Sequence, residues 1–231
     1  QKPYTKWVEE KQVNLKDLPA TDFQFNLDHE TVLNRQVAFG YSIEDLKFVI
    51  APMVGNATEA TGSMGNDTPL AILSQKPQIL FNYFKQLFAQ VTNPAIDSIR
   101  EELVMSMEVT LGKERNLLTE SPEHCRKLKV EHPILTGDEM EKIRGLDQTD
   151  LKTVVLPMLF PASEGHAGLK AAMDKLCQQA SQAIEDGDTI LVLSDKGMDA
   201  NHVPIPTLLA TAGLHHHLLR ERTRTRVGLV V

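Results

Sequence analysis

The sequence has few cysteines: only Cys125 and Cys177 occur in 231 residues, and they lie far apart in the chain. This spacing argues against a disulfide scaffold and against a zinc site of paired cysteines, and it fits a reducing compartment. Apolar runs are also short, because none reaches the roughly 18–20 residues that cross a bilayer. No signal-peptide pattern opens the chain. We therefore expect a cytoplasmic protein without a membrane partner.

Positive charge is scarce as well. The chain has 24 Lys and Arg against 31 Asp and Glu, a net charge of −7, so nucleic acid and anionic membranes would be repelled at long range. The local exception is a cluster of four arginines, Arg220, Arg222, Arg224 and Arg226. It follows a predicted helix, where the helix dipole favours cations, and we prefer this interpretation to a phosphate site.

Hydrophobic residues make up 42% of the chain. A chain of this length can bury roughly 70–75% of its unfolded surface, which predicts one sizeable core. Residues 1–40 are polar and interrupted, so we interpret them as an arm that wraps over that core. Because the chain begins at Gln1 and ends on the strand-like Gly228–Val231, we expect a piece excised from a longer polypeptide.

Three helix starts are indicated in the first two thirds of the chain. Ser42 and Asp45 form a near capping box that opens a helix with Pro52 close to its end, and Thr136 opens a short helix by the same logic. A further helix is predicted from Asp97 as N-cap, carrying Ile99 and Leu103 inward.

An apolar stripe precedes that last helix. Its residues are spaced at i, i+3, i+4 and i+7, which predicts a buried helix ending before Asn93-Pro94. The stripe consists of Phe84, Leu87, Phe88 and Val91.

From Leu151 onward, apolar strands alternate with amphipathic helices. Strands apolar on both faces with intervening helices predict parallel β-α-β units with right-handed crossovers. The predicted fold class is α/β: a partial parallel sheet, like an incomplete barrel, with an N-terminal helical part and an extended arm. The predicted strands are 153–160, 189–193 and 227–231, and the predicted helices are 169–184 and 205–220.

Asp195 directly follows the predicted strand 189–193. Loops at the carboxyl ends of parallel strands hold ligands, so Asp195 stands where chemistry would occur. The alternative is that Asp195 caps a turn or pairs with a basic residue.

Histidines suggest metal sites only weakly. Neighbours on a helix point about 100° apart, so His215, His216 and His217 cannot all face one ion. We expect one buried, hydrogen-bonded histidine and two more exposed ones. His124 beside Cys125 is not evidence of a catalytic pair, because neighbours in sequence need not meet in space.

The loop from Ser63 to Thr68 is too rich in Gly, Asn and Asp for regular structure. Its backbone amides could cradle an anion. Equally, Asn66 and Asp67 could tie the loop to its own backbone. Met64 is most simply a core filler.

Three runs of residues carry a resemblance to a known family. They are GSMGNDTPLA at 62–71, YFKQLFAQVTNP at 83–94 and REELVMS at 100–106. Together they are similar to the central domain of glutamate synthase. The resemblance resumes at Leu193–Asp195 and at 205–217, so it covers most of the chain from Gly40 onward.

The resemblance implies a domain organisation and a function. Residues 1–40 would be the arm from the preceding domain and 41–231 a truncated central domain. That domain would connect the amidotransferase and FMN-binding domains of one polypeptide. The parent reaction is the reductive transfer of the glutamine amide nitrogen to 2-oxoglutarate, giving glutamate, and the fragment alone would be inactive.

The resemblance also implies site residues. Ammonia would pass through an internal tunnel whose wall includes Met64, Thr92, Asn93 and Ile96, with Asp97 beside them. The interface loops would include Ser63, Asn66, Asp67 and Asp195.

This chain departs from the family where the chemistry of the parent takes place. Gln1 is not the catalytic N-terminal cysteine, no cysteine cluster is present, and Lys196 stands where the family more often has arginine. FMN and the iron–sulfur cluster are therefore expected in the parent and not in this fragment. The parent would draw electrons from ferredoxin or from an NADPH-oxidising subunit, in a plastid if it is of the plant type.

Two other functions stay open. The chain could be an independent α/β domain with a small molecule near Asp195, or a purely structural interaction module.

Overall fold

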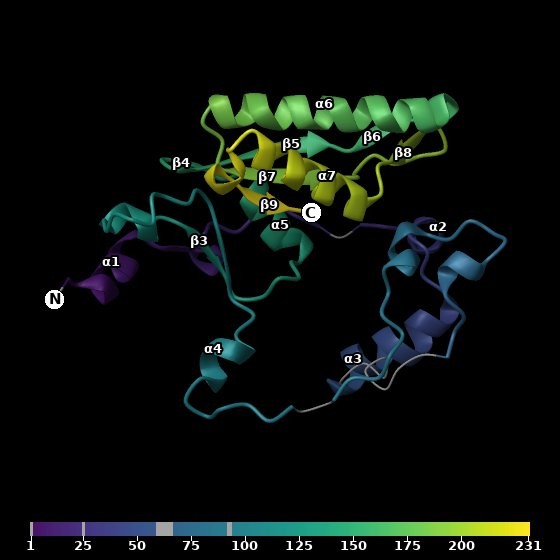
Figure 1. Ribbon diagram of the computed structural model, residues 1–231, viewed down its shortest axis with the longest axis horizontal. Coiled ribbons are helices and arrows are strands. Elements are labelled where there is room, and N and C mark those ends of the chain that lie inside the picture. The colour runs from purple at the N-terminus through teal and green to yellow at the C-terminus, as the bar shows by residue number, and fades with distance from the viewer. Residues whose placement is uncertain (1, 25, 59–66, 92–93) are drawn as a thin grey trace. The chain divides into compact units, whose positions relative to one another are not determined.

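The computed structural model describes residues 2–24, 26–58, 67–91 and 94–231. Its contacts divide the chain into two compact units, which are described separately (Figure 1). The first unit combines Gln1–Gln24 with Met107–Val231, and the second is Phe25–Ser106.

The first unit is built on a four-stranded sheet. Three of its strands are parallel, as predicted, while the fourth pairs antiparallel at one edge. This confirms the parallel α/β class, with an open sheet and not a closed barrel. In spatial order the strands are β4 (Asp147–Gln148), β5 (Leu151–Pro157), β7 (Ile190–Ser194) and β9 (Gly228–Val230).

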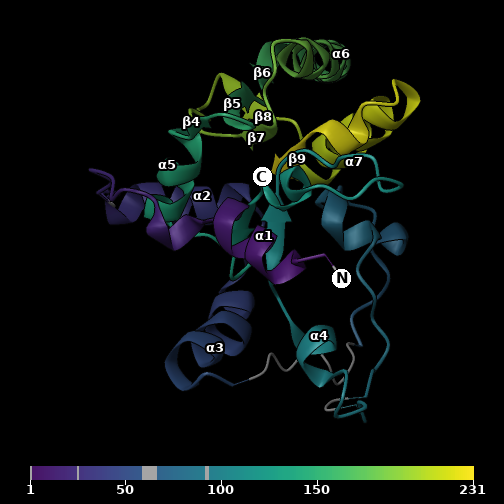
Figure 2. The same ribbon diagram turned by 90° about the vertical axis from the view of Figure 1, so that its left-hand side faces the viewer.

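Two helices cover one face of this sheet, α6 (Gly165–Glu185) and α7 (Thr207–Arg220). Leu191 and Leu193 of β7 belong to the hydrophobic core between the sheet and these helices. Figure 2 shows α6 and α7 on the same side of the sheet and α5 on the other. Gly187, at φ +92°, supplies the left-handed turn that follows α6.

The other face of the sheet carries a second core, to which Ile190 and Val192 of β7 contribute. This core is closed by α5 (Gly137–Arg144) and by a three-stranded sheet. The strand order of that sheet is β1 (Val13–Asn14), β3 (Leu128–Val130) and β2 (Val109–Leu111). β1 runs parallel to β3, and β2 runs antiparallel to it.

The N-terminal arm takes part in the second core. After α1 (Tyr4–Lys11), β1 pairs with β3, and Leu15 and Leu18 are buried. The Thr21 hydroxyl then donates to the Asp138 carboxylate at 2.7 Å. The limits of the two predicted domains, 1–40 and 41–231, stay a prediction.

The predicted strand 153–160 is two strands with a break at Met158. The Met158 N–H donates to Ser194 O at 2.8 Å, and its carbonyl accepts the Ile205 N–H at 2.8 Å. The chain then continues as β6 (Leu159–Pro161), which pairs antiparallel with β8 (His202–Pro204).

The capping prediction at Thr136 is confirmed. Its hydroxyl accepts the Glu139 N–H, and the Glu139 carboxylate accepts the Thr136 N–H, which is a complete capping box at the start of α5. Short 3₁₀ turns complete the unit, at Leu15–Asp17, Pro122–Cys125, Ala162–Glu164 and Arg224–Arg226.

The second unit contains helices and turns. Ser42 and Asp45 exchange the predicted capping bonds, and the helix continues past Pro52 to Asn56. A π-helical stretch, Asp45–Ile50, leads into α3 (Ala51–Asn56), so the missing N–H of Pro52 falls near the irregular turn. The other elements are α2 (His29–Ala38), α4 (Glu101–Met105) and 3₁₀ turns at Ala71–Leu73 and Leu80–Tyr83.

The helix predicted over residues 84–91 is wrong, because that stretch has no helix. Phe84 and Val91 are 70% and 79% exposed. Asp97 does accept the Ile99 N–H at 3.0 Å, but α4 begins only at Glu101. No described residue of this unit is buried. Short helices depend on tertiary packing, and the apolar stripe finds no core to pack against here.

The bond between Thr21 and Asp138 predicts a pH dependence of stability. Mainly through this bond, with help from Lys142, the pKa of the Asp138 carboxyl is lowered. Asp138 therefore contributes stability above its unfolded pKa of 3.8, and this contribution is lost as the pH falls through the folded pKa. The stability difference between wild type and Asp138→Asn, measured by urea unfolding, should be fully present at neutral pH and should decline only below pH 3.8, as the pH falls through the lowered folded pKa. Asp174→Asn is the control, because the ion pair that the structure shows for Asp174 among the described residues is with the exposed Lys170. A difference for Asp138→Asn that is constant with pH would contradict the prediction.

Candidate functional site

Asp195 lies where the sequence predicts it, directly after the carboxyl end of β7. It is half-buried. The turn around it is held by a bond from the Lys196 N–H to Ser194 Oγ at 3.2 Å and one from the Met198 N–H to Asp195 O at 3.2 Å. Gly197, at φ +98°, permits this turn.

An ion-pair chain joins the Asp195 loop to α5. Lys196 Nζ lies 3.7 Å from Glu141 Oε1, and the same oxygen accepts a bond from Arg144 Nη1 at 2.6 Å. With Asp195 included, two cations and two carboxylates balance. This compensated charge favours the interpretation of a loop tied to its neighbouring helix over an anion site.

The three consecutive histidines differ from the prediction. Two of them are half-buried and hydrogen-bonded, and none is fully buried. His217 Nε2 lies 2.9 Å from Ser181 Oγ, and His215 Nδ1 accepts a bond from Arg224 Nε at 3.0 Å. Only His216 is exposed. Within the described ranges, no three His, Cys, Asp or Glu side chains are grouped so that they could hold a metal ion.

Arg224 of the basic cluster (Arg220, Arg222, Arg224 and Arg226) stabilises the turn that follows α7. Arg220 is in the last turn of that helix, as predicted. Arg224 also donates from Nη1 to Val227 O at 2.8 Å, so it links α7 to the start of β9. His124 likewise bonds locally, to Ser121 and to Asn116 O.

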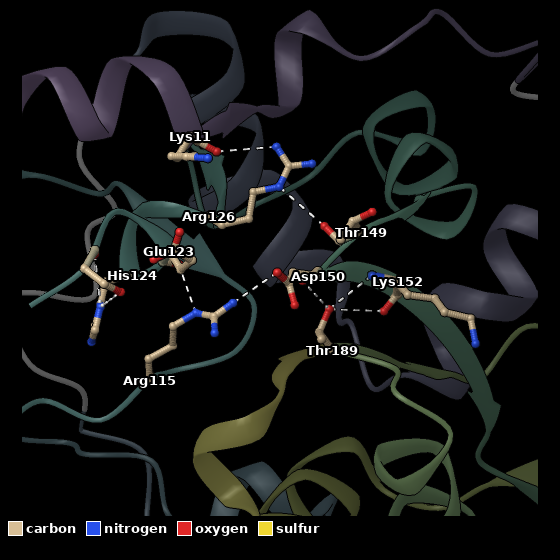
Figure 3. Close-up of polar contacts among 10 residues, drawn as sticks. Lys11, Arg115, Glu123, His124, Arg126, Thr149, Asp150, Lys152 and Thr189 are labelled. Carbon is tan, nitrogen blue, oxygen red and sulfur yellow. Dashed lines mark hydrogen bonds and ion pairs between the residues drawn. The ribbon is translucent and has the colours of Figure 1, made fainter. Parts of the chain in front are cut away.

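A polar network that the sequence does not predict lies at the amino end of β5 (Figure 3). Thr189 Oγ1 donates to Asp150 O at 3.1 Å and accepts the Lys152 N–H at 3.1 Å. It thereby fixes the turn at Asp150, whose φ is +65°. The Asp188 carboxylate, 3.0 Å from Lys152 Nζ, raises the pKa of that amine.

Two arginines extend this network to more distant segments (Figure 3). Arg115 donates to Asp150 Oδ2 at 3.0 Å and to Glu123 O at 3.1 Å. Arg126 donates to Thr149 O at 3.4 Å and to Lys11 O, at the end of α1, at 3.5 Å. The network lies at the amino ends of the strands. Because ligands bind at the carboxyl ends of parallel strands, the network stabilises the opposite end of the sheet.

Most residues expected in the ammonia-tunnel wall and the interface loops lie outside the described residues. They are Met64, Thr92 and Asn93 of the wall and Ser63 and Asn66 of the loops. Within the described part, Ile96 is half-buried and Asp67 is exposed. Their roles stay a prediction.

Comparison with known proteins identifies the family of the chain. The family profile described as "Glutamate synthase central domain" matches residues 34–231.

The chain belongs to this family.

Glutamate synthases from distant organisms are similar over the chain's length. The chloroplastic ferredoxin-dependent glutamate synthase of Spinacia oleracea is 42% identical over 234 residues, covering 99% of this chain and 14% of the relative. The glutamate synthase [NADPH] large chain of Bacillus subtilis is 42% identical over 231 residues, 99% and 15% of the two chains. The glutamate synthase [NADH] of Schizosaccharomyces pombe is 41% identical over 205 residues, 88% and 10%.

The family resemblance implies FMN and an iron–sulfur cluster in the parent enzyme, and the residues of this central domain do not fit the cluster. Such a cluster takes three or four thiolates, whereas this chain has two cysteines. Cys125 lies in a 3₁₀ turn and Cys177 in α6. Burial raises the pKa of the Cys177 thiol, which disfavours the thiolate that binds metal.

Two buried threonine hydroxyls on neighbouring segments of this central domain make a matched pair. Thr189 Oγ1 has three bonded contacts, whereas Thr153 Oγ1 is buried without a partner among the described residues. Thr189→Val should cost about 1–3 kcal/mol, because it leaves buried backbone groups unpaired. Thr153→Val should be neutral or stabilising. Urea unfolding of both variants checks this, and equal losses would contradict it.

Proposed function

We propose that this chain is the central, flavin-free scaffold domain of a glutamate synthase. It would connect the amidotransferase domain, where ammonia is released from glutamine, to the FMN-binding domain, where 2-oxoglutarate becomes glutamate. The observation that carries the proposal is the match of the central-domain family over 34–231 in a chain that spans 14–15% of relatives named glutamate synthases.

The second unit supports a connecting role. Large apolar side chains are exposed along it, and no described residue of the unit is buried. Apolar surface on this scale marks a protein interaction site. Packing against other domains of the same polypeptide would cover it. Examples are Ile43 at 77%, Val54 at 82%, Ile99 at 90% and Leu103 at 80% exposure.

The scaffold would also form part of the wall of an ammonia tunnel between the two active sites. A path for neutral ammonia needs small polar contacts and an apolar collar that keeps bulk water out. Met64, Thr92, Asn93 and Ile96 supply these chemistries, and the family resemblance assigns them to the wall. The interface loops would be formed by Ser63, Asn66, Asp67 and Asp195.

The proposed parent reaction is the glutamate synthesis that the names of the relatives share, whereas their electron donors differ. Their names specify ferredoxin, NADPH or NADH at 41–42% identity. For the compartment we propose the cytoplasm, or a plastid for an enzyme of the plant type. Among the described residues, no helix combines the length and the apolar character that spanning a membrane requires.

Blocking the tunnel should uncouple the two half-reactions. In the full-length enzyme, Met64→Trp or Thr92→Trp should leave glutamine hydrolysis active and lower the glutamate formed per glutamine hydrolysed, because the larger side chain obstructs ammonia. The measurement is the ratio of ammonia released to glutamate formed.

Leu118→Trp is the control, since Leu118 is 93% exposed in the other unit. Unchanged coupling in both tunnel variants would remove these residues from the wall.

A second candidate function is small-molecule binding near Asp195, which the position of this residue after β7 favours. A ligand bound only by the folded state stabilises that state, by about 2.7 kcal/mol at a hundredfold excess over Kd. The melting temperature rises in consequence. We expect no shift when the 231-residue chain is mixed with glutamine or 2-oxoglutarate. A saturable shift that Asp195→Asn abolishes would favour this second function over the scaffold.

A further inference from the structure

β9 has a free edge. Among the residues that the structure describes, β7 pairs with β9 on one side and no strand pairs with it on the other. The Gly228 N–H donates to Thr189 O at 2.8 Å, so the backbone groups of Gly228 point toward β7. Successive residues of a strand point these groups in opposite directions, which turns the N–H and C=O of Leu229 toward the free edge. Such an edge is a template for another strand.

An apolar pocket of about 540 Å³ adjoins this edge. We call it the β9 pocket. It continues the second core outward, since Val130 and Val230 belong to that core and Leu111 and Met140 pack against it. No charged side chain lines it, and Ile134 at its rim is 86% exposed. Its lining residues are Val109, Leu111, Val130, 133–135, Met140 and 229–231.

The helix layer has an uncovered flank as well. His217 contacts Ser181 of α6, so this side of α7 faces α6. At 100° per residue, Leu208 and Leu219 lie on the opposite side. Leu219 is 48% exposed. Because α6 joins β5 to β7 and α7 joins β7 to β9, this flank lies over the free edge of β9.

We propose that the free edge of β9, the β9 pocket and the outer flank of α7 are the docking site of a further β-α unit of the same polypeptide. Its strand would run parallel to β9 and place apolar side chains in the pocket, and its helix would pack beside α7. Parallel sheets are covered on both faces. The helix of such a unit would extend the α6–α7 layer on one face, and side chains of its strand would fill the pocket beside the second core on the other.

Two observations indicate that the docked β-α unit belongs to the same polypeptide. Each strand from β5 through β7 to β9 is added on the same side of its predecessor, which makes the outer edge of β9 the next position. The glutamate synthases to which the chain is similar are also about seven times as long, so they contain further chain to fill it. This inference rests on family membership and is independent of the ammonia tunnel.

Amide hydrogen exchange tests the proposal at two neighbouring residues. Val230 points toward β7 and Leu229 toward the free edge. In the full-length protein both amides should exchange slowly. In the 231-residue chain Val230 should stay protected, while Leu229 should exchange at least about tenfold faster than in the full-length protein. A Leu229 amide that exchanges rapidly in the full-length protein would overturn the proposal, whether or not the shorter chain folds.

A pair of variants tests the pocket itself. Ile134→Glu should lower the melting temperature of the full-length protein and leave that of the 231-residue chain unchanged, because Ile134 is exposed only without the occupant. Leu118→Glu, at a residue 93% exposed outside the pocket, should change neither. Equal effects of Ile134→Glu in both proteins would refute the docking site. Protection of Leu229 in the shorter chain that rises with its concentration would identify a second copy as the occupant and refute the proposal.

Discussion

The first unit depends on one strand, β7, that is buried along all five of its residues. Its side chains alternate between two hydrophobic cores, with Leu191 and Leu193 facing the long helices and Ile190 and Val192 facing α5 and the smaller sheet. Parallel pairing to β5 and β9, with a core on each face, leaves this strand almost no contact with solvent, so its apolar side chains stabilise both layers at once. The Asp195 loop and the β9 edge take their positions from this arrangement.

The sequence predicted the parts of the fold that depend on local pattern. The runs that became β5 and β7 are apolar on both faces, and the capping box at Thr136 is a short-range signal, so both were found. The break at Met158 was missed because it depends on Ser194 and Ile205, which are distant in sequence. The Thr189 network was missed for the same reason: its hydroxyl bonds Asp150, 39 residues away, and no spacing announces such a contact.

In the second unit, the helical spacing of Phe84, Phe88 and Val91 was a sound pattern without a core to satisfy it. Periodicity indicates which face a segment would bury, but burial needs a surface to pack against. Of the residues assigned to the tunnel wall, Ile96 is half-buried, while Met64, Thr92 and Asn93 lie outside the described residues. Their assignment came from family resemblance, since neither charge nor spacing marks them as special.

The first unit is assembled from two segments of chain, 1–24 and 107–231, with the second unit between them. β1 must pair with β3, whose residues are more than a hundred positions later. On the ribosome, Leu15 and Leu18 would therefore emerge long before their core exists, and they would stay solvated until β3 and β7 had been synthesised. The arm can therefore reach its native contacts only after most of the chain has been made.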